Sequence, residues 1–121
     1  MPLPAIKRRV LVVEDEVIVA MLIEDMLVDL GYTVAALTTH LDEALTLART
    51  MPLDLAVLDV NLNGQMSYPV ADALRSRGVP FVFATGYGAK ILPASYSGAT
   101  TLQKPFQITD LQRALQSVRV D

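Results

Sequence analysis

The stretch Phe81-Val82-Phe83-Ala84-Thr85-Gly86-Tyr87-Gly88 decides the fold expected for this chain. Its first four residues form an uninterrupted apolar run, as in a parallel strand that helices cover on both faces. A hydroxyl and two glycines follow, and open α/β sheets bind ligands just outside the carboxyl ends of such strands. We therefore expect a buried central strand that ends at a functional site.

Three other apolar runs also lead directly into polar residues. They are 10–13 followed by Glu14-Asp15-Glu16, 55–58 followed by Asp59, and 101–103 followed by Lys104-Pro105. If all four strands run parallel, these polar side chains meet at one edge of a single sheet.

The order of elements along the chain predicts an α/β fold. Apolar periodicity indicates helices over about 17–30, 41–49, 67–78 and 108–118, and a further strand over 33–37. Short connections favour right-handed crossovers, and hence a doubly wound, five-stranded parallel sheet that alternates with five helices. Pro93 makes the fourth helix short or irregular, and 61–64 has the composition of a loop. We expect one domain over 1–121, with a loose N-terminus at 1–8.

Composition narrows the classes of function. The 121 residues carry a net charge of −3, are 52% hydrophobic and include no cysteine and one histidine, which suits a core without disulfides or thiolate metal sites. The only basic run is Lys7-Arg8-Arg9, and no apolar stretch reaches the ~20 residues that span a bilayer. We expect a cytoplasmic protein, a monomer or weak homodimer, with no nucleic-acid or membrane partner.

The acidic residues at the strand ends suggest a metal site. Glu14, Asp15 and Asp59 would crowd like charges together, which is unfavourable unless a cation neutralises them. Mg²⁺ prefers hard oxygen ligands and keeps several waters, so these carboxylates and the backbone carbonyl of Asn61 would suffice. A carboxylate beside Mg²⁺ can attack a phosphoryl group, and Asp59 is the nucleophile by position.

The other two strand ends supply donors for a phosphoryl group. Thr85 offers a hydroxyl and Lys104 an ammonium, while Gly86 leaves the group accessible. Each feature alone also has a plain structural explanation, such as a solvated loop, a capping threonine or a Lys104–Asp59 ion pair. Together they place every polar group at one edge of the sheet, which those explanations leave unexplained.

The order Glu14-Asp15, Asp59, Thr85, Lys104-Pro105 resembles the receiver domain of two-component response regulators, and the resemblance spans nearly the whole chain. The Phe-Ala-Thr-Gly-Tyr stretch followed by Lys-Pro-Phe is similar to a subgroup often found as single-domain proteins. The resemblance implies the flavodoxin-like (βα)5 receiver fold and a phosphoprotein of a phosphorelay that is phosphorylated on Asp59. It further implies metal ligation by Asp15 and Asp59, Glu14 acting through water, phosphoryl contacts from Thr85 and Lys104, and a cis Lys104-Pro105 bond.

Two positions depart from the family pattern. Glu14 is longer than the aspartate that most receivers carry there, which can alter the metal geometry. Leu102 stands where the resemblance places a Tyr or Phe whose rotamer follows Thr85 on phosphorylation. Tyr87 is the nearest aromatic that could replace it, so we expect the switch to lie in residues 85–98.

The first predicted helix also carries more apolar surface than one packed face needs. Ile18, Met21 and Leu22 lie towards the side that bears Asp25, and in the resembling family this region meets the phosphodonor. We expect these four residues to dock a histidine kinase or histidine phosphotransfer protein.

The favoured function is a phosphoacceptor with slow self-dephosphorylation, not an enzyme. With no output domain in the sequence, it would signal by binding an unknown downstream protein or act as a phosphate sink. One alternative is an aspartyl-phosphate-type small phosphohydrolase, but such enzymes usually need an Asp two residues after the nucleophile, where this chain has Asn61. The other is a protein-binding pseudo-receiver that is never phosphorylated.

Overall fold

The computed structural model describes residues 7–86 and 92–119. Five parallel strands form one sheet in the order β2-β1-β3-β6-β7. Their bounds are β1 Arg9–Val13, β2 Thr33–Thr38, β3 Leu55–Asp59, β6 Phe81–Thr85 and β7 Thr101–Gln103. The predicted doubly wound α/β fold is confirmed, and β3 lies at the centre of the sheet, between β1 and β6.

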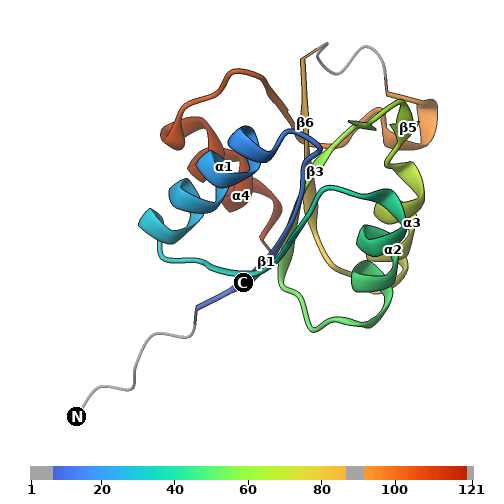
Figure 1. Cartoon of the computed structure of the whole chain (residues 1–121), viewed down its shortest axis with the longest axis horizontal. Coiled ribbons are helices and arrows are strands. Elements are labelled where there is room, and N and C mark those ends of the chain that lie inside the picture. Colours follow the sequence, from blue (N-terminus) through green and yellow to red (C-terminus); the bar gives the residue numbers. More distant parts are fainter. Residues whose placement is uncertain (1–6, 87–91, 120–121) are drawn as a thin grey trace.

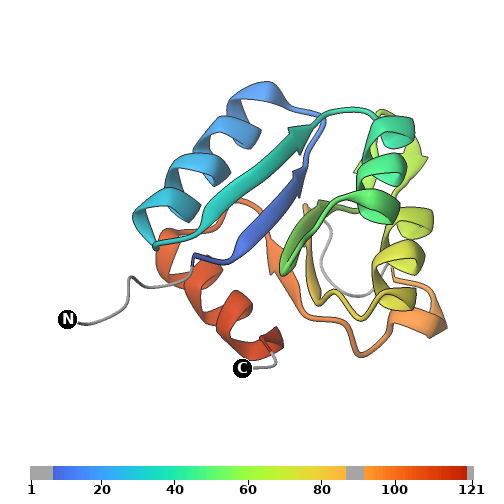
Figure 2. The same ribbon diagram turned by 90° about the horizontal axis from the view of Figure 1, so that it is seen from below.

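Among the described residues, four α-helices cover the sheet, two on each face (Figures 1 and 2). They are α1 Val17–Asp29, α2 Leu41–Thr50, α3 Tyr68–Ser76 and α4 Ile108–Val118. Figure 1 shows α1 and α4 on one face and α2 and α3 on the other. The core accordingly has two halves, because successive side chains of each strand point to opposite faces. Val10 and Val12 belong to the α1–α4 half, and Leu11 and Val13 to the other.

The helices form where apolar periodicity predicts them. In α1, Ala20, Ile23 and Leu27 lie on one buried face and pack against the sheet. The helix ends at Asp29, and Gly31, two residues later, has a φ of +90°, a left-handed conformation that glycine adopts without steric cost.

The segment after β3 is a hairpin, so the expectation of a plain loop over 61–64 is wrong. Strands β4 (Asn61–Leu62) and β5 (Gln65–Met66) pair antiparallel around a two-residue turn. Asn63 and Gly64 at the turn have φ of +54° and +88°, as a type I′ turn requires. Asn-Gly is the usual sequence for that turn because both residues tolerate positive φ.

The connection between β6 and β7 contains the 3₁₀ turn η2 (Ala94–Tyr96), so the short, irregular fourth helix is confirmed in that form. Tyr96 is buried, stacks on Tyr68 and meets Phe83 edge-on, with ring centroids 5.9 and 5.5 Å apart. Its hydroxyl donates to Asp72, and the guanidinium of Arg75 lies 4.0 Å from the ring centroid. This cluster fastens η2 to α3.

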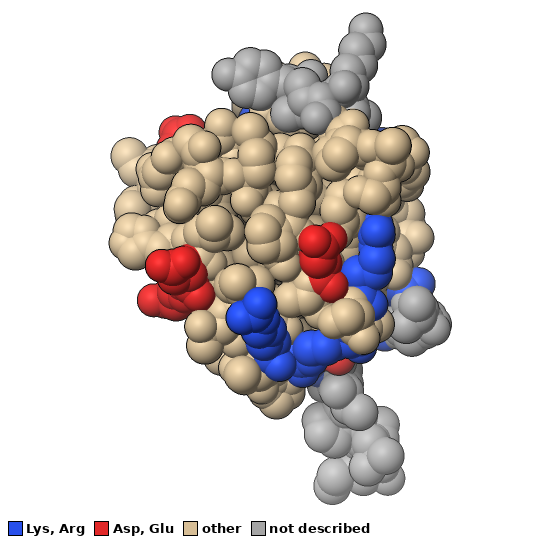
Figure 3. Space-filling model, turned by 90° about the vertical axis from the view of Figure 1, so that its right-hand side faces the viewer, with Lys and Arg blue, Asp and Glu red and all other residues tan. Residues whose placement is uncertain are grey.

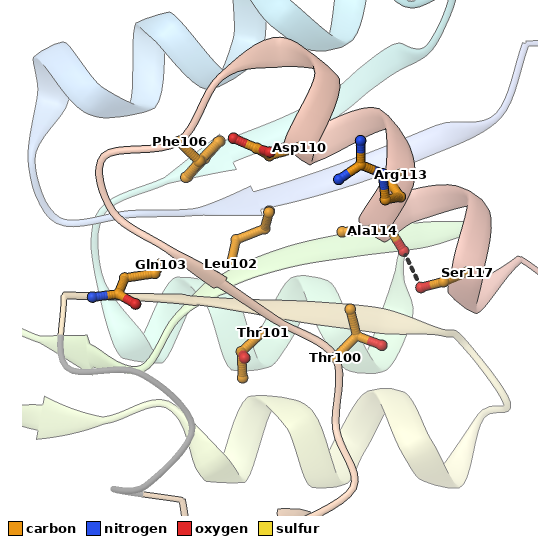
Figure 4. Close-up of a pocket in the computed structure, with 9 residues that line it drawn as sticks. All are labelled: Thr100, Thr101, Leu102, Gln103, Phe106, Asp110, Arg113, Ala114 and Ser117. Atoms are coloured by element: carbon orange, nitrogen blue, oxygen red, sulfur yellow. Dashed lines mark hydrogen bonds between the residues drawn. The ribbon is translucent and has the colours of Figure 1, made fainter.

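Tyr87, the predicted replacement for an aromatic switch, lies outside the described residues. Leu102 is described and is buried on the α1–α4 face, beside a hollow of about 520 Å³ that Phe106 and Asp110 also line (Figure 4). Thr85 follows Phe83 on the opposite face, and its partner across the strands is Gln103. Leu102 therefore does not face Thr85, contrary to the expectation for a switch position. The β7 side chains on the face of Thr85 are Thr101 and Gln103, and neither is aromatic.

Figure 3 views the face made by α2 and α3, where basic side chains form a short row along the lower edge. Arg77 donates to the carbonyl of Ala48 at 2.7 Å, near the end of α2, and Arg75 donates to the carbonyl of Ser95 at 3.1 Å. The two arginines thus join the C-terminal end of α3 to α2 and to η2. Within the described residues, no helix has the length and apolar character to span a bilayer.

Candidate functional site

Three carboxylates meet at the carboxyl edge of the sheet. Glu14 and Asp15 follow β1, and Asp59 is the last residue of the adjacent strand β3. One oxygen from each lies within 4.8 Å of the others. Glu14 and Asp59 are buried, whereas Asp15 is partly exposed and opens the cluster to solvent. The predicted convergence of these side chains is therefore confirmed.

Backbone N–H groups fix two of the carboxylates. The N–H of Asn63, in the hairpin turn, donates to Asp15 Oδ2 at 3.0 Å. The N–H of Glu16 donates to Glu14 Oε2 at 3.0 Å. Burial alone would raise the pKa of Asp15, but the hydrogen bonds it accepts, that from Asn63 first, hold its pKa below the ordinary value.

Lys104 bridges the other two carboxylates. Its ammonium donates to Glu14 Oε1 and lies 3.2 Å from Asp59 Oδ2. The bond between Lys104 and Pro105 is cis, as the resemblance implied. Burial opposes the charge on Lys104, but its hydrogen bond to Glu14 and the charge of Asp59 raise the pKa of the ammonium. The sequence did not predict that Glu14 would be a partner of Lys104.

The pKa of the Asp59 carboxyl lies well above its ordinary value. Burial first, and the neighbouring charge of Glu14 second, raise its pKa to about 7, against the attraction of Lys104. A negative charge on Asp59 is unfavourable here, because the carboxyl is buried beside the charge of Glu14. A cation or a chemical modification that relieves the repulsion would therefore be favourable at Asp59.

Thr85 flanks the cluster from the other side. It ends β6 on the strand adjacent to β3, one residue beyond the partner of Asp59. Its side chain is buried, and its carbonyl accepts the N–H of Lys104 at 2.9 Å. This backbone bond ties the end of β6 to the residue that supplies the ammonium.

The donor set suits Mg²⁺. All the candidate ligands are oxygens, the choice of a hard cation, and Asp15 leaves the site open to water. The Ser67 N–H bonds the Val60 carbonyl at 2.8 Å, next to the Asn61–Met66 pair in the hairpin. Bonded and non-bonded pairs alternate in an antiparallel ladder, so the Asn61 carbonyl lies outside it, as a metal ligand would need. The Asn61 side chain accepts the Gly64 N–H at 2.7 Å and stabilises the turn.

Comparison with known families agrees with this geometry. The family described as the response regulator receiver domain matches residues 10–116. The chain belongs to this family.

Individual relatives are similar to the chain over most of its length. The transcriptional regulatory protein PdtaR of Mycobacterium tuberculosis is 33% identical over 116 residues, which cover 93% of this chain and 57% of PdtaR. The chain thus spans little more than half the length of that curated relative. Among solved structures, SdrG from Sphingomonas melonis Fr1 is 38% identical with a TM-score of 0.83, over 93% of this chain and 96% of SdrG.

A second solved structure is similar over the same region. The receiver domain of the sensor histidine kinase PA1611 from Pseudomonas aeruginosa PAO1 is 28% identical with a TM-score of 0.80, over 93% of this chain and 98% of that one. That structure has a magnesium ion coordinated in its active-site cleft.

The predicted docking residues lie on the outer surface of α1. Ile18, Met21 and Leu22 are 76%, 56% and 53% exposed, and Asp25 is exposed beside them. Leu22 also lines an apolar hollow of about 330 Å³ between α1 and the segment 104–106 that precedes α4, whose walls include Phe106 and Lys104. The exposed surface of α1 therefore continues to the residue that contacts Asp59.

Proposed function

We propose that this receiver domain accepts a phosphoryl group on Asp59 in a Mg²⁺-dependent reaction in the cytoplasm. The donor is a histidine kinase or a histidine phosphotransfer protein. The observation that carries the proposal is the position of Asp59 at the end of the central strand, with two carboxylates within 4.8 Å and an ammonium at 3.2 Å. The residues around Asp59 thus supply both a cation site and a donor.

The chemistry follows from these groups. An Asp59 carboxylate oxygen forms a bond to phosphorus as the bond between phosphorus and the donor's imidazole nitrogen breaks, giving an acyl phosphate and a free histidine. Water later breaks the phosphorus–oxygen bond and returns Asp59 and phosphate. Lys104 and the hydroxyl of Thr85 donate to the new phosphoryl oxygens.

Mg²⁺ would be held by Asp15, Asp59 and the Asn61 carbonyl, and Glu14 would act on the ion through a water molecule. When bound, it supplies positive charge that offsets repulsion between Asp59 and the incoming phosphoryl oxygens. The PA1611 receiver domain, which contains a magnesium ion in its cleft, supports this assignment.

Acetyl phosphate with and without MgCl₂ tests the proposal. Intact-mass measurement should show one added phosphoryl group in the wild-type protein, with Mg²⁺ only. Asp59→Asn should add none, while Asp25→Asn, an exposed aspartate on α1, should behave as wild type. Equal labelling of Asp59→Asn would move the site elsewhere, and an unlabelled wild-type protein would favour the pseudo-receiver instead.

We infer that the donor protein docks on α1. From residue 10 to residue 48 the chain has no Lys or Arg, and Glu16, Glu24 and Asp25 lie in or before α1. A partner helix that inserts an aliphatic side chain between Leu22 and Phe106 and carries basic residues around it would match both the hollow and the charge.

We propose that the signal passes onward through the segment from Thr85 to residue 98, with Tyr87 as the aromatic that responds. Phosphorylation adds about −1.5 to −2 charge beside Thr85, and Leu102 faces the other half of the core. Amide exchange with and without a beryllofluoride mimic should change most in this segment, and less in Tyr87→Ala. A change confined to β7 and α4 would contradict the proposal.

A further inference from the structure

Glu14 is the most deeply buried charged side chain of the site, with 1% exposure. Both of its carboxylate oxygens are engaged, Oε2 by the Glu16 N–H and Oε1 by the Lys104 ammonium. The same ammonium lies 3.2 Å from Asp59 Oδ2. One cation is thus shared between the phosphoacceptor and a second carboxylate on the neighbouring strand.

We propose that Glu14 competes with the phosphoryl group on Asp59 for the ammonium of Lys104, and so limits how long that group survives. Glu14 acts here as a positioning residue, because it affects the reaction only through Lys104. This inference rests on the proposed function, since the competition exists only if Asp59 is phosphorylated.

The length of the Glu14 side chain is what makes the competition possible. An aspartate at this position would be shorter by one methylene, about 1.5 Å, so it could not keep both the Glu16 N–H bond and the contact with Lys104. The contact therefore depends on the residue type at position 14 and not only on the fold. The presence of Glu14, where most receivers have an aspartate, therefore makes the contact with Lys104 possible.

Burial makes the competition persistent. A buried carboxylate that loses its cation is left with an unpaired charge, which is costly, so Lys104 does not leave Glu14 freely. A phosphoryl group on Asp59 adds about −1.5 to −2 charge and draws Lys104 the other way. A cation held by Asp15 and Asp59 would also compensate Glu14, so the release of Lys104 is expected to be easier with Mg²⁺ present.

The first test is the lifetime of the phosphoryl group after removal of free acetyl phosphate, at saturating Mg²⁺. Glu14→Asp should lengthen the half-life about threefold, as expected for the loss of one competing contact worth somewhat under 1 kcal/mol. Glu14→Gln, which keeps the length and removes the charge, should change it in the same direction. Glu43→Asp is the matched control, because it makes the same change in an exposed side chain of α2 that is outside the carboxylate cluster.

The second test asks whether the effect passes through Lys104. In a Lys104→Met background, Glu14→Asp should leave the phosphoryl half-life unchanged. In the unphosphorylated, metal-free protein, the side-chain ¹⁵N resonance of Lys104 should shift in Glu14→Asp and stay in place in Glu43→Asp. This resonance reports the ion pair without any phosphorylation step.

The outcomes separate the two proposals. A wild-type protein that takes no phosphoryl group overturns the proposed function, and this inference with it. A wild-type protein that is phosphorylated, with a half-life unchanged by Glu14→Asp and Glu14→Gln, overturns this inference alone. Equal lengthening in the wild-type and Lys104→Met backgrounds would also overturn it, because Glu14 would then act independently of Lys104.

Discussion

The two faces of the sheet are completed in different ways. On one face, α2 packs against α3, and an aromatic cluster around Tyr96 fills the core beneath them. On the other, α1 buries Ala20, Ile23 and Leu27 and still presents a row of exposed apolar side chains to solvent. Among the described residues, α2 and α3 carry no exposed large apolar side chain.

This difference between the two faces indicates that they serve different purposes, one for stability and the other for partner binding. Residues of the α2–α3 face touch mostly their own core, so changes there should alter folding. The outer residues of α1 contribute little to the core, so changes there should alter partner binding instead. The acidic site lies between the two faces and takes groups from both, Lys104 from one and Thr85 from the other.

The largest expected effect is on the face covered by α2 and α3. Tyr96→Ala should lower the free energy of unfolding by about 3–5 kcal/mol, because it empties a buried aromatic site. Tyr96→Phe should cost about 1 kcal/mol, the loss of the hydrogen bond to Asp72. Urea denaturation measures both, with the exposed Val28→Ala as the control near zero. A Tyr96→Ala loss below about 1 kcal/mol would mean that the cluster does not fasten η2 to α3.

The second prediction concerns the site between the faces. The pKa of Asp59 is raised from 3.8 to about 7, so between these values the folded protein binds more protons than the unfolded chain. Without Mg²⁺, stability should therefore fall as pH rises from about 4 to about 7. Asp59→Asn should be roughly 2 kcal/mol more stable than wild type at pH 8, with a smaller difference at pH 5.

Thermal unfolding at several pH values, with and without MgCl₂, measures this effect. Mg²⁺ should stabilise the wild-type protein more at pH 8 than at pH 5, because it offsets the repulsion among the carboxylates. Asp25→Asn should leave the pH dependence unchanged. If Asp59→Asn showed the same pH dependence of stability as the wild-type protein, a group other than Asp59 would be responsible for it.

The third prediction tests the exposed apolar surface of α1. Met21→Glu should slow transfer from the cognate donor protein about tenfold, since it places a charge among apolar anchors and beside Asp25. Unfolding free energy and acetyl phosphate labelling should stay at wild-type values. Val28→Glu makes the same change on an exposed residue of the last turn of α1 and should have little effect. Equal slowing by both variants would mean that the added charge acts at long range and not by docking.

The smallest effect is expected in the hairpin that holds Asp15. Gly64→Ala should cost about 1 kcal/mol because the φ of +88° is strained for a residue with a Cβ. It should also weaken Mg²⁺ binding, since the adjacent Asn63 N–H orients Asp15. Gly98→Ala, where φ is not positive and the added methyl group would meet no atom within 4 Å, should be neutral. Isothermal titration with MgCl₂ gives the affinity, and unchanged affinity would contradict the orienting role.

Much of the fold could be predicted because strand burial leaves a local signal. The apolar runs that end at Asp59 and Thr85 identify both strands and the edge of the sheet where their last residues lie. The exposed row on α1 was likewise predictable, because Ile18, Met21 and Leu22 exceed what one buried helix face requires. The hairpin was missed, although Asn63-Gly64 is the usual pair for its turn.

Other features depend on tertiary geometry that periodicity does not contain. The contact between Glu14 and Lys104 joins residues 90 positions apart and depends on the length of one side chain. The face occupied by Leu102 depends on the register between β6 and β7, in which Leu102 is the partner of Ala84 and not of Thr85. The Asn63 N–H reaches Asp15 only because residues 61–66 fold into the hairpin.

The most direct test of the central claim is to locate the phosphoryl group itself. The protein is labelled with acetyl phosphate and Mg²⁺, the acyl phosphate is reduced with borohydride, and the peptides are sequenced by mass spectrometry. The account predicts reduction at Asp59 alone, and no reduced residue when Mg²⁺ is removed by EDTA. Reduction at Glu14 or Asp15, or at Asp59 to the same extent without Mg²⁺, would contradict it.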